Sequence, residues 1–477
     1  MAVDLDLSFT SATEIARQVR TCKLSPVDVV KNALVRIDEI DPTLNAFCFV
    51  FPEEAIEEAK VMEREAREGW FRGPLHGVPF AIKDVTPTKG KRTTFGSYAF
   101  EHHVPDHDAT IVEALKRAGG IMIGKTTTPE FACGSATESP LWGISRNPWD
   151  PERTPGGSSG GSAIAVATGC VPLAEGSDMG GSVRIPASFC GIVGYKPSFG
   201  RIPFTILPSQ FDQISHFGSL ARTIDDTRLF LQVTQGPDER DIQSIKPALD
   251  FINDGHQDVA GLRLGLCLDF GNRVWDPEVE SAVRQSAEVL KVRGAEIVDV
   301  SLSWGADLEN AWAKHWCVYL ATFHGHTVEK YREKIDPRVL AYLERGLAMP
   351  AVEFKSIEIE RTRAWMELAP ILESCDALLC PTMAFPAVRV AGADNADFWV
   401  TDEKGRYRGL DVTSVFNFVS QCPALSIPCG WAQNAPMADG LPIGLQIVGR
   451  RFDDLMPLRI ASVLEAELPW GHRRPPI

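Results

Sequence analysis

The chain has 477 residues, 44% of them hydrophobic and 23% charged, a composition typical of a globular protein with a substantial core. Its 63 Asp and Glu residues outnumber 48 Lys and Arg residues, which gives a formal net charge of −15. This acidic balance argues against a nucleic-acid partner. No run of 18 apolar residues predicts a membrane span, so we expect neither a nucleic-acid nor a membrane partner.

Cysteine usage and the N-terminal sequence favour a cytoplasmic location. The N-terminus has no basic segment followed by an apolar one, as a secretory signal would. Eleven cysteines are scattered without a CxxC pair or zinc-like spacing. An odd number of cysteines without such a signal favours reduced thiols, most of them small core residues.

Helical patterns dominate residues 1–70, which we expect to be the N-terminal helical part of a single domain spanning 1–477. Ser11 and Glu14 form a capping box, and Ser25-Pro26 predicts a second helix start with apolar residues at helical spacing after it. Residues 53–68 predict an acidic surface helix.

Beyond this part, short apolar runs alternate with helical segments. The run Val78–Ile82 is typical of a buried strand, and a helix predicted over 108–118 leads into a strand at 121–123. Further apolar runs lie at 163–167, 171–174, 262–267, 377–380 and 443–448, and Asp276-Pro277 opens a helix. This alternation predicts an α/β fold with a central mixed, mostly parallel, twisted sheet flanked by helices. Residues 300–375 are mostly helical in pattern and are a candidate helical cap or insertion.

Residues 154–200 are unusually rich in glycine and serine, with GGSSGGS at Gly156–Ser162 and DMGGS at Asp178–Ser182. Dense glycines suit tight turns or a close approach of backbone to a ligand. Flexible linkers are one alternative, but both runs are short and continue directly into apolar segments. A phosphate-binding loop is another, and it fails because Ser162-Ala163 follows Gly161 where Lys and Ser or Thr are required.

A serine hydrolase needs a nucleophile, a base and donors for an oxyanion. Two glycines permit a tight turn in which backbone N–H groups converge on one point, and Ser182 at its end would attack. The converging N–H groups would be those of Met179, Gly180, Gly181 and Ser182.

The choice of base lies between histidine and lysine. None of the ten histidines lies in either motif, and the G-x-S-x-G elbow is absent, so a Ser–His–Asp triad using His76 is a minor alternative. Lys83 ends the apolar run Val78–Ile82, and burial lowers a lysine pKa by up to about 3–5 units. Its alternative role is a surface lysine paired with Asp84.

Three motifs together resemble the amidase signature family: GVPFAIKD, TPGGSSGGSA and SDMGGSVRIPASFCGIVGYKPS. Their order and spacing match, with 75 residues from Lys83 to Ser158 and 24 from Ser158 to Ser182. The resemblance extends from about Leu75 through PIGLQIVGRR at 442–451. It implies a Ser–cis-Ser–Lys triad with Ser182 as nucleophile, Ser158 as bridging serine and Lys83 as base, and a cis peptide between Gly157 and Ser158.

The resemblance also implies supporting residues and a reaction. Ser159 would hydrogen-bond within the relay, and Asp178 and Arg184 would be an orienting pair. Met179 departs from the Thr or Ile common in the family, but its role is through the backbone N–H. The implied reaction is hydrolysis of a small-molecule carboxylic amide through a Ser182 acyl-enzyme, without metal or other cofactor.

Substrate and assembly are less constrained by the sequence. We hypothesise that Phe131 and the tryptophan-bearing segment 304–316 line an apolar pocket, with ordinary core packing as the alternative. The expected substrate is then a hydrophobic or aryl amide, an anilide or a carbamate. A glutaminase-type A subunit of a tRNA-dependent amidotransferase is the alternative function, and a non-catalytic binding protein is a third. A homodimer is the candidate assembly.

Overall fold

The computed structural model describes residues 3–252, 258–271, 273–390, 399–401, 407–409, 412–433 and 440–477. Within them, eleven strands form one sheet, in the spatial order β1 (Phe47–Val50), β3 (Ile121–Thr126), β2 (Pro79–Lys83), β6 (Leu173–Asp178), β8 (His216–Ala221), β7 (Val193–Lys196), β14 (Ala424–Ala432), β15 (Leu441–Gly449), β11 (Ala377–Pro381), β9 (Arg263–Asp269) and β10 (Glu296–Ser301). Two small sheets pair β4 (Glu138–Ser139) with β5 (Gly143–Ile144) and β12 (Trp399–Thr401) with β13 (Tyr407–Gly409).

The expected mixed sheet of an α/β fold is confirmed, with its parallel pairs on the two flanks. Strands β3, β2 and β6 pair in parallel on one flank, and β11, β9 and β10 on the other. The central pairs from β6 to β11 are antiparallel, as is the edge pair of β1 with β3. The central strands β8 and β15 are buried along their whole lengths although their neighbours are antiparallel, because helices cover both faces of the sheet.

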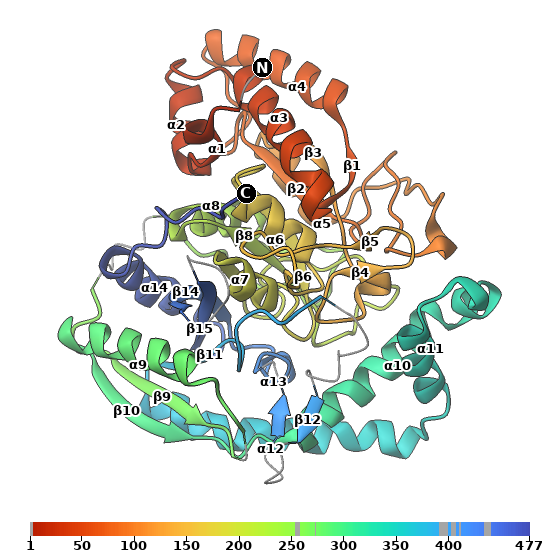
Figure 1. The fold of residues 1–477 in the computed structure, drawn as a ribbon, viewed down its shortest axis with the longest axis vertical. Coiled ribbons are helices and arrows are strands. Elements are labelled where there is room, and N and C mark those ends of the chain that lie inside the picture. Colours follow the sequence, from red (N-terminus) through yellow and green to blue (C-terminus); the bar gives the residue numbers. More distant parts are fainter. Residues whose placement is uncertain are drawn as a thin grey trace.

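Helices cover both faces of the sheet (Figure 1). One face packs against α2 (Ala12–Arg20), α5 (Thr110–Arg117), α8 (Ile224–Thr234), α9 (Pro277–Val292) and α14 (Met456–Glu467). The other packs against α3 (Pro26–Leu44), α4 (Pro52–Arg67), α6 (Gly160–Ala167) and α7 (Arg184–Cys190). In β2, Phe80 and Ile82 join the first core and Ala81 joins the second, because successive strand residues point to opposite faces. The same alternation turns Lys83 toward the face that carries α6 and α7.

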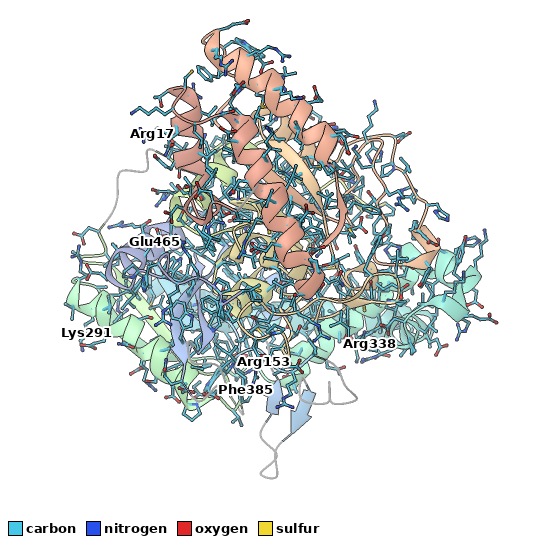
Figure 2. The ribbon with its side chains drawn as sticks, turned by 45° about the horizontal axis from the view of Figure 1, so that its top comes forward. Arg17, Arg153, Lys291, Arg338, Phe385 and Glu465 are labelled. Carbon is cyan, nitrogen blue, oxygen red and sulfur yellow. The ribbon has the colours of Figure 1, made fainter. Side chains whose placement is uncertain are left out.

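Several predicted helix starts are confirmed. Ser11 accepts a hydrogen bond from the N–H of Glu14 and caps α2, while Ser25 and Asp276 cap α3 and α9. The acidic surface helix is α4. Figure 2 shows charged side chains such as Arg17 and Lys291 projecting outward from such helices. The remaining short helices are α1 (Leu5–Ser8), α13 (Val415–Phe418) and the 3-10 turns η1 (Tyr98–Phe100), η2 (Glu130–Ala132) and η3 (Arg332–Lys334).

Residues 300–375 are almost entirely helical, after the end of β10. They form α10 (Ala306–Lys330), α11 (Pro337–Leu347) and α12 (Ala351–Ser374). Helices α10 and α11 pack together at one side of the molecule, while α1 to α4 gather at another (Figure 1). None of the described helices combines the length and apolar composition that crossing a bilayer requires. Nine of the eleven cysteines are buried, as expected of core residues.

Candidate active site

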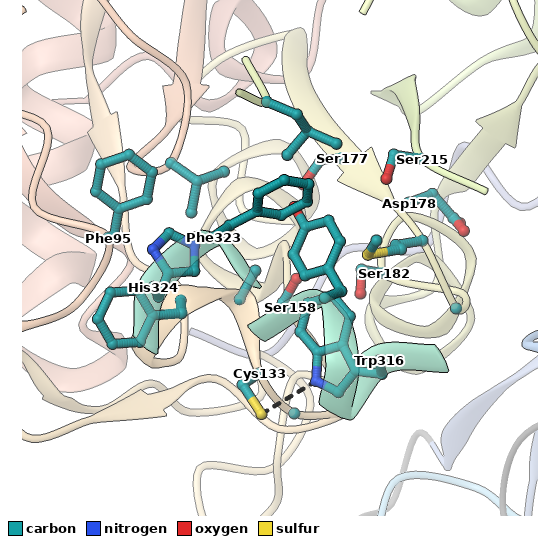
Figure 3. A pocket seen from close by; sticks show the side chains of 18 of the residues that line it. Phe95, Cys133, Ser158, Ser177, Asp178, Ser182, Ser215, Trp316, Phe323 and His324 are labelled. Carbon is teal, nitrogen blue, oxygen red and sulfur yellow. Dashed lines mark hydrogen bonds between the residues drawn. The ribbon is translucent and has the colours of Figure 1, made fainter. Parts of the chain in front are cut away.

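The structure brings the three expected catalytic side chains together. Ser158 and Ser182 line one cavity (Figure 3), and Lys83, which is not among the lining residues, contacts Ser158. Lys83 is buried, and its Nζ donates hydrogen bonds to Ser158 Oγ at 2.5 Å and to Ser177 Oγ at 3.0 Å. The peptide between Gly157 and Ser158 is cis. Ser177 is a further polar contact of Lys83 that was not among the predicted site residues, and it directly precedes the DMGGS motif.

Burial makes Lys83 a weak base of the kind that hydrolysis requires near neutral pH. Desolvation lowers the pKa of Lys83 to about 7, against the opposing charges of Glu175 and Asp178. The alternative of a surface lysine paired with Asp84 is wrong, because Asp84 faces Lys125, whose Nζ is 3.6 Å from its Oδ1. Burial therefore favours the neutral form of the Lys83 amine.

The backbone turn of residues 179–182 is held by donors on its carbonyl side. Each of the four carbonyl oxygens of the turn accepts a hydrogen bond. The Met179 carbonyl accepts from Trp312 Nε1 at 2.9 Å, and the Gly180 carbonyl accepts from Thr413 Oγ1 at 2.8 Å. The Gly181 carbonyl accepts from Ile185 N at 2.7 Å, and the Ser182 carbonyl accepts from Ser159 N at 3.1 Å. In a trans peptide the N–H points away from the C=O, so these bonds aim the N–H groups of Gly180 and Ser182 the other way. The Gly181 N–H, which was predicted to be one of four oxyanion donors, instead donates to Asp178 Oδ1 at 2.8 Å.

Asp178 and Arg184 form a buried ion pair directly beneath the turn. Arg184 Nε and Nη2 donate to the two carboxylate oxygens at 3.0 and 2.9 Å. Arg184 also donates to Gln446 Oε1 at 2.7 Å and to Asn417 Oδ1 at 2.6 Å. Burial alone would raise the pKa of Asp178, but the Arg184 charge and hydrogen bonds hold it well below its usual range. The carboxylate is therefore ionised, and it accepts the backbone N–H of Gly181 in the turn and that of Val183 directly after it.

Two other sequence candidates lie outside the relay. The Ser159 hydroxyl donates to the Ser177 carbonyl at 3.4 Å and the Ser159 N–H donates to the Ser182 carbonyl at 3.1 Å, so these two hydrogen bonds end on backbone carbonyl oxygens. The ring of His76 is buried against the Met62 carbonyl at 3.0 Å, and its other nitrogen accepts from the Arg72 N–H at 3.2 Å. A Ser–His–Asp triad with His76 is therefore wrong.

The cavity beside Ser182 has a volume of about 510 Å³ and an aromatic lining (Figure 3). Phe131 packs against His324 at a ring-centroid distance of 4.5 Å, and Trp312 stacks on Trp316 at 6.1 Å. Burial lowers the pKa of His324 to about 4, so its ring is neutral. The aromatic lining side chains are Phe95, Phe100, Phe131, Phe204, Trp312, Trp316, Tyr319, Phe323 and Tyr342, together with the rings of His103 and His324.

The expected apolar pocket is thus present, with one exception. Trp304 packs instead into a separate core with Phe270 and Phe416. The charged lining residues Asp178 and Arg338 each have an ion-pair partner, Arg184 and Asp336 respectively. The cavity therefore suits an uncharged, largely apolar group.

The fold and the site define an amidase, a hydrolase that acts on amide C–N bonds. The sequence profile described as Amidase matches residues 28–458, and the chain belongs to this family. An acylamidase of Rhodococcus erythropolis is 34% identical, covering 98% of both chains. The A subunit of a glutamyl-tRNA(Gln) amidotransferase of Clostridium botulinum is 33% identical, covering 99% of this chain and 100% of that protein.

Solved structures agree with this assignment. A bacterial aryl acylamidase of the amidase signature family has a TM-score of 0.91 at 29% identity, covering 98% of both chains. A 6-aminohexanoate cyclic dimer hydrolase has a TM-score of 0.85 at 28% identity, covering 98% of this chain and 99% of that one. Both the expected family and the expected fold are confirmed.

Proposed function

We propose that this amidase hydrolyses hydrophobic or aryl amides, anilides among them, through an acyl-enzyme on Ser182. The observation that carries the proposal is the 2.5 Å hydrogen bond between Lys83 and Ser158 beside an aromatic cavity of about 510 Å³. A buried amine in contact with a serine hydroxyl is a proton acceptor, and the aromatic lining gives an apolar substrate a place to bind.

The proposed chemistry has two stages. As Ser182 Oγ bonds to the amide carbon, its proton passes to Ser158, and the proton of Ser158 passes to neutral Lys83. The same relay then returns a proton to the leaving nitrogen as the C–N bond breaks. Water attacks the resulting Ser182 ester by the same route and releases the acid. General-base catalysis of this kind contributes about 10²–10⁴-fold in rate.

The tetrahedral oxyanion would bind to the N–H groups of Met179, Gly180 and Ser182. This proposal omits Gly181, whose N–H is bonded to Asp178. The ion pair of Asp178 and Arg184 would act through position, because it fixes the turn from beneath. Each correctly placed donor is worth about 10²–10³ in rate.

Sequence identity does not decide whether the acylamidase or the amidotransferase is the better guide to the substrate, and the character of the cavity favours the acylamidase. Glutamine is a zwitterion, and its buried ammonium and carboxylate would each need a counter-charge. The charged lining residues Asp178 and Arg338 are already bound to Arg184 and Asp336. An uncharged aryl group instead gains about 1.5–3 kcal/mol on burial, which corresponds to about 10- to 100-fold in binding.

The test is a substrate panel on the purified protein with Ser182→Ala as control. We expect kcat/KM for a phenylacetic or benzoic anilide to exceed that for acetamide by at least about tenfold, with no turnover by the variant. Equal kcat/KM for glutamine and the aryl anilides would overturn the substrate proposal. The cytoplasmic location and the homodimer stay predictions, the second to be tested by light scattering.

A further inference from the structure

Glu175 is a buried carboxylate that the chemistry above does not use. It lies on β6 with no exposed surface, and its Oε2 accepts the backbone N–H of Lys83 at 2.9 Å. Its Oε1 accepts the Thr86 hydroxyl at 3.0 Å, and the Thr86 N–H donates to the Lys83 carbonyl at 3.1 Å. One carboxylate thus binds both ends of the turn that follows β2.

The other charged groups near Lys83 are paired with one another. Asp84 faces Lys125 of β3, whose ammonium also donates to the Thr86 carbonyl at 2.8 Å. Asp178 is bound to Arg184 through both oxygens. Lys196 and His216 also lie near Asp178, and the His216 ring faces the Asp178 carbonyl. Among the residues that the structure describes, Glu175 is the carboxyl group beside Lys83 that forms no ion pair of its own. Burial raises the pKa of Glu175, and the hydrogen bond from the Lys83 N–H and the charges of Lys83 and Lys125 oppose that shift and favour the carboxylate.

The reaction creates a charge at Lys83. When Ser182 Oγ bonds to the carbonyl carbon, the C=O π pair moves to oxygen, the Ser182 proton moves to Ser158, and the Ser158 proton moves to Lys83 Nζ. The products are a tetrahedral oxyanion and a Lys83 ammonium. An ammonium without a partner in a buried site is strongly disfavoured, so its formation requires a nearby negative charge.

We propose that Glu175 is the positioning residue that fixes the Lys83 turn and supplies the counter-charge for the Lys83 ammonium. This inference rests on the proposed roles of Ser182 and Lys83. The Glu175 carboxylate accepts the backbone N–H of Lys83. The negative charge of Glu175 and the ammonium of Lys83 are therefore separated by little more than the length of the lysine side chain. The charge of Glu175 also raises the pKa of Lys83 against the desolvation that lowers it.

The test is the pH dependence of Ser182 labelling by a fluorophosphonate probe, which needs no amide substrate. The second-order rate constant should rise with pH through the Lys83 pKa, because the neutral amine is the base. In Glu175→Gln this acid limb should move to lower pH by about one to two units, the size expected when one nearby unit charge is lost at an effective dielectric constant of about 20. The plateau should fall about tenfold, because a less basic lysine is a weaker catalyst.

Two controls separate this effect from a loss of structure. Glu175→Asp keeps the charge and should keep the acid limb near its wild-type position. Glu465, which lies on α14, also accepts a backbone N–H, that of Ile224. Glu465→Gln removes this carboxyl group away from the relay and should leave the pH profile unchanged. If Glu175→Gln does not fold, Glu175→Leu removes the same charge with an apolar side chain and should move the limb equally.

The outcomes are distinct. Labelling at Ser182 with an unmoved acid limb in Glu175→Gln would overturn this inference alone, because a merely structural role changes rates without changing the pKa of the base. Absence of Ser182 labelling in the folded wild-type protein would overturn the proposed function, and this inference with it.

Discussion

Gly180→Ala tests whether the proposed oxyanion turn needs space that only glycine leaves. An added Cβ would lie 2.3 Å from Trp312 Cζ2, more than 1 Å closer than an ordinary contact of 3.4–4 Å. The indole is fixed by its hydrogen bond to the Met179 carbonyl and by its stacking on Trp316. The turn or the indole must therefore move by about 1 Å. A misplacement of that size costs about 10²-fold, and loss of one oxyanion donor costs about 10²–10³-fold in rate.

We expect kcat/KM of Gly180→Ala for an aryl anilide to fall at least about 10²-fold, while the overpacking lowers the free energy of unfolding by about 1–3 kcal/mol and leaves the protein folded. Gly325→Ala on α10 is the matched control, because its Cβ would meet no atom within 4 Å. It should keep full activity and stabilise the helix by up to about 1 kcal/mol. Trp312→Ala in the Gly180→Ala background should recover part of the lost activity. Activity of Gly180→Ala within threefold of the wild type would refute the steric argument.

Three further predictions concern the base, the ion pair and the cavity. The kcat/KM of the wild type should rise with pH through a midpoint near 7, where Lys83 becomes neutral, and a pH-independent profile would contradict this. Lys83→Met should remain folded and lose about 10²–10⁴-fold in kcat. Asp178→Asn should lower the free energy of unfolding by about 3–5 kcal/mol, measured in urea, because Arg184 stays buried without its carboxylate. Since the folded pKa of Asp178 is depressed, its contribution should be present above pH ~4 and be lost as the pH falls further, and stability unchanged from pH 6 to 3 would contradict it. Trp316→Ala should reduce the preference for aryl over short aliphatic anilides by about tenfold, and an unchanged ratio would show that the indole does not contact the substrate.

The residues of the proposed relay each lie in a short motif, so the sequence alone could suggest them. The motifs alone do not show that Lys83 and Ser158, which are 75 residues apart in the sequence, contact each other on one face of the sheet. That contact depends on the side-chain alternation of β2 and on the packing of α6 against it, which are properties of the folded chain. The hydrogen bond from the Gly181 N–H to Asp178 depends on the position of the Asp178 side chain, and no sequence pattern predicts it.

The aromatic lining of the cavity has a sequence signal, which is the spacing of aromatic residues along α10. Trp312, Trp316, Tyr319 and Phe323 follow one another at spacings of four, three and four, which places them on one face of α10. That face lines the cavity. Trp304 precedes the helix, outside this repeat, and is packed in a separate core. Whether a helix face meets a cavity or a core is decided by the elements opposite it, so periodicity alone could not separate the two.

The most direct test of the account is the mass of the protein during turnover. Rapid acid quenching with an aryl anilide, followed by peptide mass spectrometry, should find the substrate's acyl group on the peptide that contains Ser182. The adduct should be absent from Ser182→Ala. An acyl group on another residue, or turnover with no adduct when hydrolysis of the ester is made rate-limiting, would contradict the claim that Ser182 is the nucleophile.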